Sequence, residues 1–246
     1  MSPLHRWLLA APLSLLSLLT ASVSHAEGTS ASGRRALVAR EQGKPHTLVE
    51  VGFGVLALPA AEVCIGGPDQ CVTGEISIAA GIRNLYQFGP FAVGLSGTFG
   101  STLRNDDAQG APELEREHSR QYFLVEGLFR WSFVQTNSAD AYIGTGLGLV
   151  SVRDSWSVAA DRDPAAEVKF VGAESLVIST LGLSLFVSAG GEWFFWDNFS
   201  LGGSLRYGNW ILPFDAKTSA FGDVASLSGR VDFFELQTTL AYRLAL

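Results

Sequence analysis

The residue types that most often carry catalysis or bind metal ions are sparse in this chain. Its 246 residues include four histidines and two cysteines. His46 ends a polar stretch, and His118 lies next to Ser119 in a charged segment. No spacing of His, Cys and carboxylate residues matches a metal site, so the sequence predicts no metal and no other cofactor.

The two cysteines, Cys64 and Cys71, enclose a Gly-Gly-Pro turn in the sequence CIGGPDQC. Two cysteines without a neighbouring histidine make a poor zinc site, and their spacing differs from the C-x-x-C of redox motifs. In an exported protein this arrangement favours a disulfide that closes a small loop.

The N-terminus indicates export. A weakly positive start precedes an apolar core over Trp7–Ala21, and a small-x-small motif places the cleavage site between Ala26 and Glu27. We therefore predict a signal peptide over residues 1–26; the alternative is an uncleaved membrane anchor, for which the apolar core is near the short limit. Without Arg6, the mature chain has 16 basic and 24 acidic residues and no basic cluster, which argues against nucleic-acid binding.

The last sixteen residues, VDFFELQTTLAYRLAL from Val231 to Leu246, alternate with a period of two. Apolar or neutral side chains alternate with a more polar set that includes Glu235 and Arg243, which is the pattern of a β-strand with two different faces. This strand is longer than the roughly 5–6 residues usual in soluble proteins.

Seven further segments alternate in the same way and complete a set of eight strands. They cover residues 47–58, 74–86, 91–99, 123–133, 141–152, 183–195 and 199–208. The chain is 47% hydrophobic and 17% charged, against roughly 25% charged residues in soluble proteins. Past the N-terminus no run reaches the ~20 apolar residues of a transmembrane helix. High apolar content without a spanning helix indicates either a large soluble core or a transmembrane barrel.

The predicted connections alternate between long loops and short turns. The first strand begins, and the last strand ends, on the short-turn side of the barrel. The long loops include residues 104–120, 153–179 and 212–229, and the short turns lie at residues 87–90, 136–138 and 196–198. In the longest loop, Asp163–Glu167 is compatible with a short helix or with the cap of an extended hairpin. A soluble sandwich has no reason to place every long loop at one end, whereas outer-membrane barrels do so.

From residue 47 to residue 246, the chain resembles small bacterial outer-membrane barrels of the OmpA, OmpX and OmpW type, although those usually end in Phe rather than Leu246. The resemblance implies an eight-stranded antiparallel up-and-down transmembrane β-barrel, preceded by a periplasmic lead-in over residues 27–46. It also implies an outer-membrane location, periplasmic termini and a monomer. The expected partners are phospholipid or lipopolysaccharide and the barrel-insertion machinery, with an unknown extracellular ligand.

The alternative is a soluble, lipocalin-like barrel with an apolar interior. Two features instead indicate that the apolar face of the strands contacts lipid. Aromatic residues gather at the short-turn ends of the strands, and the other strand face consists of Gly, Ala and Ser with isolated charges. Because charges inside a small barrel must be paired, we predict an ion-pair network that plugs the lumen, with Glu50 reaching Arg83 and Arg243. The alternative is that these charges are scattered and face solvent. The predicted network contains Glu50, Arg83, Glu126, Arg130, Glu192, Arg206, Glu235 and Arg243.

Two functional classes remain for such a barrel. The first is a non-enzymatic scaffold or surface module whose long loops meet partners. The second is OmpW-like passage of small hydrophobic solutes, for which four inward apolar residues could line a pocket: Leu56, Leu124, Leu128 and Phe186. The same residues could equally be lumen packing. Lipid A deacylases of this size use a His-x-Ser pair on a strand, and palmitoyl-transfer sites use a loop His with Ser and Asp; neither pattern is convincing here.

Overall fold

The structure of the protein is a computed structural model that describes residues 45–64, 71–102, 106–107, 117–136, 138–157, 175–196, 198–220 and 224–245. The predicted signal peptide, its cleavage site at Ala26–Glu27 and nearly all of the predicted lead-in lie outside the described residues. Asp163–Glu167, the segment predicted as a helix or hairpin cap, also lies outside them.

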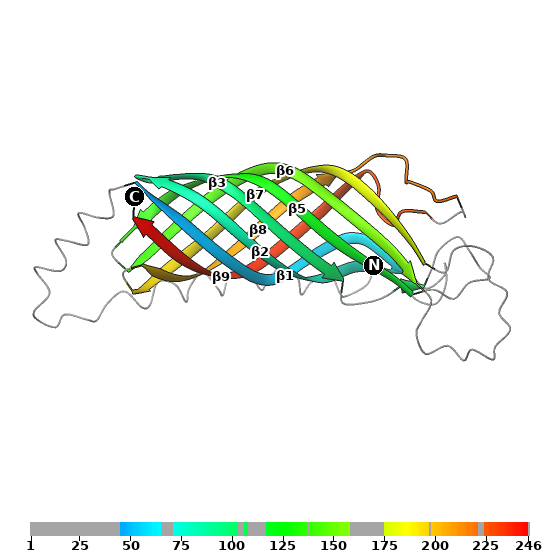
Figure 1. The fold of residues 1–246 in the computed structure, drawn as a ribbon, viewed down its shortest axis with the longest axis horizontal. Helices are drawn as coiled ribbons and strands as arrows, with labels where there is room; N and C mark the ends of the chain where they lie inside the picture. Colours follow the sequence, from blue (N-terminus) through cyan, green and yellow to red (C-terminus); the bar gives the residue numbers. More distant parts are fainter. Residues whose placement is uncertain are drawn as a thin grey trace, which may run out of the picture. The chain divides into compact units, whose positions relative to one another are not determined.

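Eight long strands form one closed antiparallel barrel (Figure 1). Each long strand pairs with the next long strand in sequence, and β1 pairs with β9 to close the ring. The predicted eight-stranded up-and-down barrel is therefore confirmed. The described residues contain no helix of the length and apolar character needed to cross a membrane. The strands are β1 (His46–Cys64), β2 (Cys71–Phe88), β3 (Phe91–Thr102), β5 (Glu117–Gln135), β6 (Ala139–Ser157), β7 (Ser175–Trp196), β8 (Phe199–Ile211) and β9 (Arg230–Ala245), with the two-residue β4 (Asp106–Asp107) beside β5.

One end of the barrel, the short-turn end, holds the tight turns and the outer ends of β1 and β9. His46 lies opposite Ala245 in the β1–β9 register. The β2–β3 turn consists of Gly89 and Pro90, and Gly89 adopts a φ of 57°, a left-handed conformation that other residues rarely take. At the other end, the long-loop end, residues 212–229 connect β8 to β9 as predicted.

At the long-loop end the strands run further than their apolar pattern predicts. β6 continues to Ser157 and β7 begins at Ser175, so the predicted loop over residues 153–179 is too long. The outward positions of the β6 extension, Arg153 and Ser155, are polar, so a count of apolar residues ends this strand too early. The inward positions still alternate, because Val152, Asp154 and Trp156 are all buried. Backbone pairing, rather than contact with an apolar surface, defines the ends of these strands.

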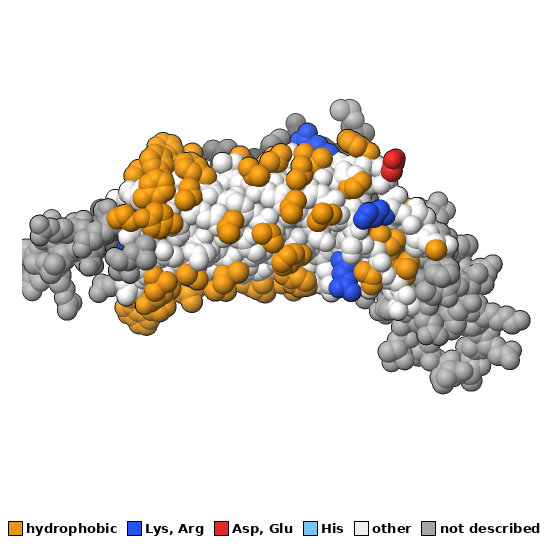
Figure 2. All heavy atoms as spheres, turned by 45° about the horizontal axis from the view of Figure 1, so that its top comes forward, with side chains coloured by type: hydrophobic (Ala, Val, Ile, Leu, Met, Phe, Trp, Pro, Cys, Tyr) orange, Lys and Arg blue, Asp and Glu red, His pale blue; other side chains and the backbone are white. Residues whose placement is uncertain are grey.

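The outer wall of the barrel is apolar along its length. Large side chains such as Phe53, Leu95 and Leu147 expose 63%, 64% and 67% of their surface. Figure 2 shows hydrophobic side chains spread over the face of the barrel that it views. This is the reverse of a soluble barrel, where the outer face is wet and the interior apolar.

Towards the long-loop end, the interior is packed with apolar side chains. The cluster includes Leu56, Tyr122, Leu124, Val150, Val152, Phe186, Trp210 and Phe233. Glycines on the inner face of β6 make room for it: a Cβ on Gly146 would collide with the ring of Phe186. Leu212 and Leu227 of the 212–229 segment belong to the same cluster, so this segment closes the barrel over its apolar layer.

Candidate functional site

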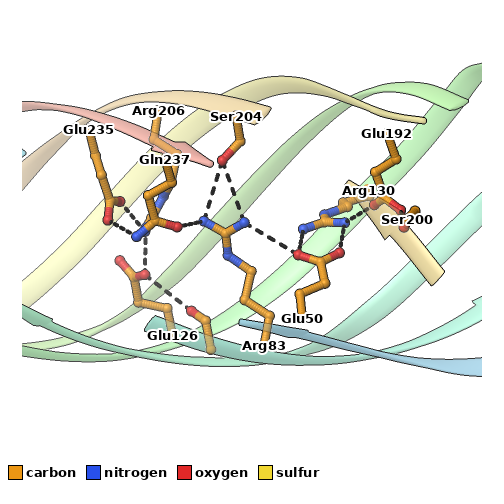
Figure 3. A network of polar contacts seen from close by, with 11 residues as sticks. Glu50, Arg83, Glu126, Arg130, Glu192, Ser200, Ser204, Arg206, Glu235 and Gln237 are labelled. Atoms are coloured by element: carbon orange, nitrogen blue, oxygen red, sulfur yellow. Dashed lines mark hydrogen bonds and ion pairs between the residues drawn. The ribbon is translucent and has the colours of Figure 1, made fainter. Parts of the chain in front are cut away.

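The inner face carries a buried network of ion pairs that connects six strands (Figure 3). Its charged members are Glu50 from β1, Arg83 from β2, Glu126 and Arg130 from β5, Glu192 from β7, Arg206 from β8 and Glu235 from β9, and each is at most 7% exposed. The period-two pattern places all of them inside, and the closure of the ring brings distant strands together.

The part of the network nearer the short-turn end is centred on Glu50. Arg130 binds both carboxylate oxygens of Glu50, with Nη2 at 2.6 Å from Oε2. Arg83 reaches the same Oε2 through Nη1 at 3.3 Å. Arg130 Nη1 also lies 3.4 Å from Glu192 Oε1, and Ser200 donates to the other oxygen of Glu192 at 2.8 Å.

The deeper part of the network is centred on Arg206. Its Nη1 lies 2.5 Å from Glu235 Oε2, and its Nη2 pairs with Glu126. Glu126 also accepts hydrogen bonds from Ser184 Oγ at 2.7 Å and Ser96 Oγ at 3.3 Å. Arg130, Arg206, Glu50, Glu126 and Glu192 therefore each bind more than one partner, which immobilises the layer.

Gln237 joins the two parts. Its side-chain oxygen accepts a hydrogen bond from Arg83, and its Nε2 donates to Glu235. Aromatic faces cover the guanidinium groups: Arg130 lies 4.2 Å from the ring centroid of Tyr142, and Arg206 lies 3.8 Å from that of Phe186. Ion pairs that are hydrogen-bonded and covered in this way leave few polar atoms unsatisfied inside the barrel.

A cavity of about 10 Å³ lies between the two parts, lined by Arg83, Arg130 and Arg206 among others. That volume is about the size of one water molecule. The layer is therefore filled by its own side chains, as expected for the lumen of an eight-stranded barrel.

Arg243, the eighth residue of the predicted network, lies nearer the short-turn end. It is opposite Leu48 in the β1–β9 register, and its guanidinium lies 4.5 Å from the ring centroid of Phe194. Together with His46 and Asp140 it lines a cavity of about 20 Å³. We predicted that Glu50 would reach both Arg83 and Arg243; the ion pairs that the structure shows for Glu50 are with Arg83 and Arg130.

The four residues predicted to line a solute pocket belong to or touch the apolar cluster. Leu56, Leu124 and Phe186 are at most 5% exposed within it, and Leu128 packs against its edge. These contacts correspond to the alternative interpretation of the four residues as lumen packing.

A second buried polar cluster at the long-loop end was not predicted. Arg120 pairs with Glu75, which also accepts hydrogen bonds from Tyr122 and Ser77. Arg120 Nε also donates to Ser226 Oγ at 2.6 Å. Continued alternation upstream of Phe123 could have revealed the inward position of Arg120, whereas no sequence signal marks a loop serine as its partner.

His118 belongs to the same cluster. Its Nε2 lies 2.8 Å from Asp154 Oδ1, and its ring stacks on Trp156 with centroids 4.7 Å apart. Ser226 donates to Asp154 through both its backbone N–H and its hydroxyl, so that hydroxyl is not directed at the imidazole. His118 and Asp154 are at most 4% exposed. The geometry fastens the 212–229 segment to the barrel wall rather than assembling an activated nucleophile.

Within the described residues, no group of three or more His, Cys, Asp or Glu is arranged to hold a metal ion. Cys64 and Cys71 are directly opposite one another in the β1–β2 register. Opposed residues of antiparallel strands are about 4.5 to 5.5 Å apart at Cα, which is compatible with a disulfide. The side chains of both residues lie outside the described part of the chain, so the disulfide stays a prediction.

No protein-family model and no curated protein sequence matches this chain. Among solved structures, the fold is similar to that of a major outer membrane protein from Thermus thermophilus, with a TM-score of 0.52 and 13% identity over 81% of this chain and 99% of that one. Neisserial surface protein A matches with a TM-score of 0.48 and 12% identity over 80% of this chain and 96% of that one. The outer membrane protein OprG from Pseudomonas aeruginosa matches with a TM-score of 0.44 and 12% identity over 83% and 99%. The chain thus has the fold of small outer-membrane barrels.

Proposed function

We propose that the protein is an integral barrel of the bacterial outer membrane whose lumen is closed and whose role is exercised through the surface at its long-loop end. The proposal includes no enzymatic activity. The observation that carries it is the inverted distribution of side chains, with ion pairs inside the barrel and large apolar side chains on its outer wall.

The outer wall supports the membrane location. A soluble monomer rarely exposes a contiguous apolar patch larger than a few hundred Å². Here the exposed apolar residues include members of all eight long strands. In a bilayer these side chains meet hydrocarbon, and the closed ring of strands leaves no unpaired edge at membrane depth.

The aromatic residues support an orientation. Exposed Tyr86, Phe88, Phe91, Trp193 and Trp196 all lie within a few residues of the tight turns. Rings of this kind occupy the membrane interface in outer-membrane barrels, whose short turns face the periplasm. The short-turn end is then periplasmic, and both ends of the barrel domain lie on that side because His46 is opposite Ala245.

The network supports a closed lumen. An open pathway would have to pass between Glu50, Arg130 and Arg206, whose charged groups are held by several partners each. Breaking a buried pair leaves uncompensated charge and costs several kcal/mol, about 3–5 in measured cases. Beyond the network a solute would meet the packed apolar cluster and the 212–229 segment.

OmpW-like passage of a small hydrophobic solute is the second candidate. Inward Leu56, Leu124 and Phe186 are its chemical basis, because they form an apolar layer towards the long-loop end. Passage would require that layer to repack around the solute. The packed arrangement therefore favours the closed barrel.

Membrane fractionation and gel mobility of the full chain test this proposal. A folded outer-membrane barrel stays with the membrane after high-salt and carbonate washes, and it migrates faster on a gel before boiling than after. Release by salt alone would contradict the membrane location. Accumulation of a small apolar solute inside vesicles that contain the protein, above vesicles without it, would favour passage over a closed scaffold.

A further inference from the structure

Arg153 is a cation on the outer wall of the barrel, near its long-loop end. It occupies an outward position of β6 and is exposed, opposite Ser179 of β7. Arg153 forms no hydrogen bond or ion pair with another described residue. Its neighbours across the strands are Ser179 of β7, a small residue, and Gln121 of β5.

A second cation reaches the same point from the 212–229 segment. Lys217 Nζ donates a hydrogen bond to the backbone oxygen of Ser179 at 2.6 Å. This contact uses one of the three ammonium donors. Ser179 is therefore next to both residues, to Arg153 through the strand register and to Lys217 through this hydrogen bond. The carboxylate adjacent to Arg153 in sequence, Asp154, faces the interior of the barrel.

A groove of about 400 Å³ is lined by Lys217 and Ser179, and Arg153 is opposite Ser179 in the β6–β7 register. Its β7 side consists of the outward Val177 with Leu176 and Ile178, which pack towards the interior, and the other side consists of Lys217 and the small residues 218–220. An apolar side opposite hydroxyl groups and an ammonium suits a sugar ring that carries phosphate, because such a ring has both C–H faces and hydrogen-bonding edges.

The depth of this site corresponds to a lipid headgroup. Outward Leu181 and Trp193 of β7 are exposed and lie twelve residues apart. At ~3.3 Å per residue and a strand tilt of ~40°, they are separated by about 30 Å along the membrane normal, which spans the apolar band of about 25 Å on outer-membrane barrels. With Trp193 at the periplasmic interface, Leu181 marks the outer interface, and Ser179 is the next outward residue.

We propose that Arg153, Lys217 and the adjoining groove bind the phosphorylated sugar headgroup of a glycolipid in the outer leaflet. The acyl chains lie along the apolar wall that Leu181 and Leu183 continue. A phosphate group bound next to Ser179 accepts hydrogen bonds from the remaining N–H donors of Arg153 and Lys217. Figure 2 shows Lys and Arg side chains at the end of the hydrophobic surface away from its densest hydrophobic patches. This inference rests on the proposed outer-membrane location.

The test measures binding of bisphosphorylated lipid A to the full chain folded in detergent, by native mass spectrometry over a lipid titration. The variants are Arg153→Gln, Lys217→Gln and the double variant. Arg153→Lys should retain most of the binding because it keeps the charge. Arg230→Gln is the matched control, since Arg230 is also exposed at this end but already contacts Asn209 and Asp232.

Each charge-assisted contact is worth about tenfold in affinity. We expect the single variants to weaken lipid A binding about tenfold and the double variant more, whereas Arg230→Gln changes it less than about twofold. Lipid A without phosphates should bind the unaltered chain as weakly as lipid A binds the double variant.

Equal binding by the unaltered chain and the double variant would overturn the site. Displacement of lipid A by millimolar inorganic phosphate would overturn the lipid as the source of the phosphate. Heat-modifiable mobility in vesicles is recorded first for every variant. A chain that never enters vesicles contradicts the proposed location, whereas one that enters but binds lipid A regardless of Arg153 and Lys217 contradicts this site alone.

Discussion

Replacing Glu50 by Gln changes one atom of the buried network and removes one charge. The Glu50 carboxylate is 1% exposed and accepts hydrogen bonds from Arg130 through both oxygens and from Arg83 through one. A Gln at this position offers a single acceptor oxygen, and its NH₂ group would face the N–H donors of the arginines. Both arginines then lose their shared counter-charge.

The expected loss follows from what each arginine retains. Arg83 keeps Ser204 and Gln237, and Arg130 keeps Glu192 at 3.4 Å and the face of Tyr142. Removing one partner of a buried pair costs about 3–5 kcal/mol. Because the remaining contacts compensate in part, we expect about 3 kcal/mol in the free energy of unfolding.

Glu192→Gln is the matched control for this prediction. Glu192 is also buried, but its nearest cation is 3.4 Å away and its hydrogen bond from Ser200 can persist with Gln. We expect a loss of about 1 kcal/mol, the size of one ordinary hydrogen bond.

The assay is urea unfolding at pH 7 of the protein folded in phosphatidylcholine vesicles, followed by tryptophan fluorescence and gel mobility. The network has four glutamates and three arginines, so either variant corrects the same imbalance of charge. If overall balance governed stability, both variants would behave alike. Equal effects, or a Glu50→Gln loss below about 0.5 kcal/mol, would refute the argument from local pairing.

Three further predictions concern the inner face, the outer wall and the long-loop end. Gly146→Ala should lower the free energy of unfolding by about 1–3 kcal/mol, because its Cβ would collide with the ring of Phe186. Gly97→Ala is the control, because the nearest neighbour of its Cβ would be 4.0 Å away. The same urea titration should show a change within about 0.5 kcal/mol for this control. Leu147→Arg should cost about 2–4 kcal/mol in vesicles because this side chain, 67% exposed, meets hydrocarbon; a change within about 0.5 kcal/mol would indicate that it faces water. Thiol labelling of the exported, unreduced protein should detect no free thiol at Cys64 or Cys71, and reduction should lower stability by about 2 kcal/mol; full labelling without reductant would rule out the bridge.

The faces of the strands were predictable from the sequence because their period is two. Glu50 and Glu235 each lie between two apolar neighbours, and Arg83 continues the alternation after Ile82, which places all three on the inner face. The polar connection over residues 212–229 was also predictable, since its ends coincide with the ends of the alternation.

The pairing of charges was less predictable, because it depends on how far the strands are staggered around the ring. Arg130 and Glu50 come from strands that are not neighbours, and they meet across the lumen. Counting residues from the short-turn end estimates depth but not direction across the barrel. For Arg243 the depth itself was misjudged: it is opposite Leu48, two residues nearer the short-turn end than Glu50, and lies against Phe194.

The second buried polar cluster, around Glu75 and Arg120, was hard to predict for a different reason. Its strand residues continue the inward alternation beyond the apolar segments, so a strand predicted from apolar residues ends too early. Ser226 comes from a loop, and only the folded path of residues 212–229 brings it to Asp154.

Conductance across a planar bilayer tests the central claim, a barrel that spans the membrane around a closed, ion-paired lumen. The full chain is inserted from vesicles in which its heat-modifiable mobility has been shown, so that insertion is established independently. We expect no steady single-channel current in 1 M KCl, because Arg130, Glu50 and Arg206 fill the cross-section with side chains. A stable open level that persists at this salt concentration would contradict the closed lumen.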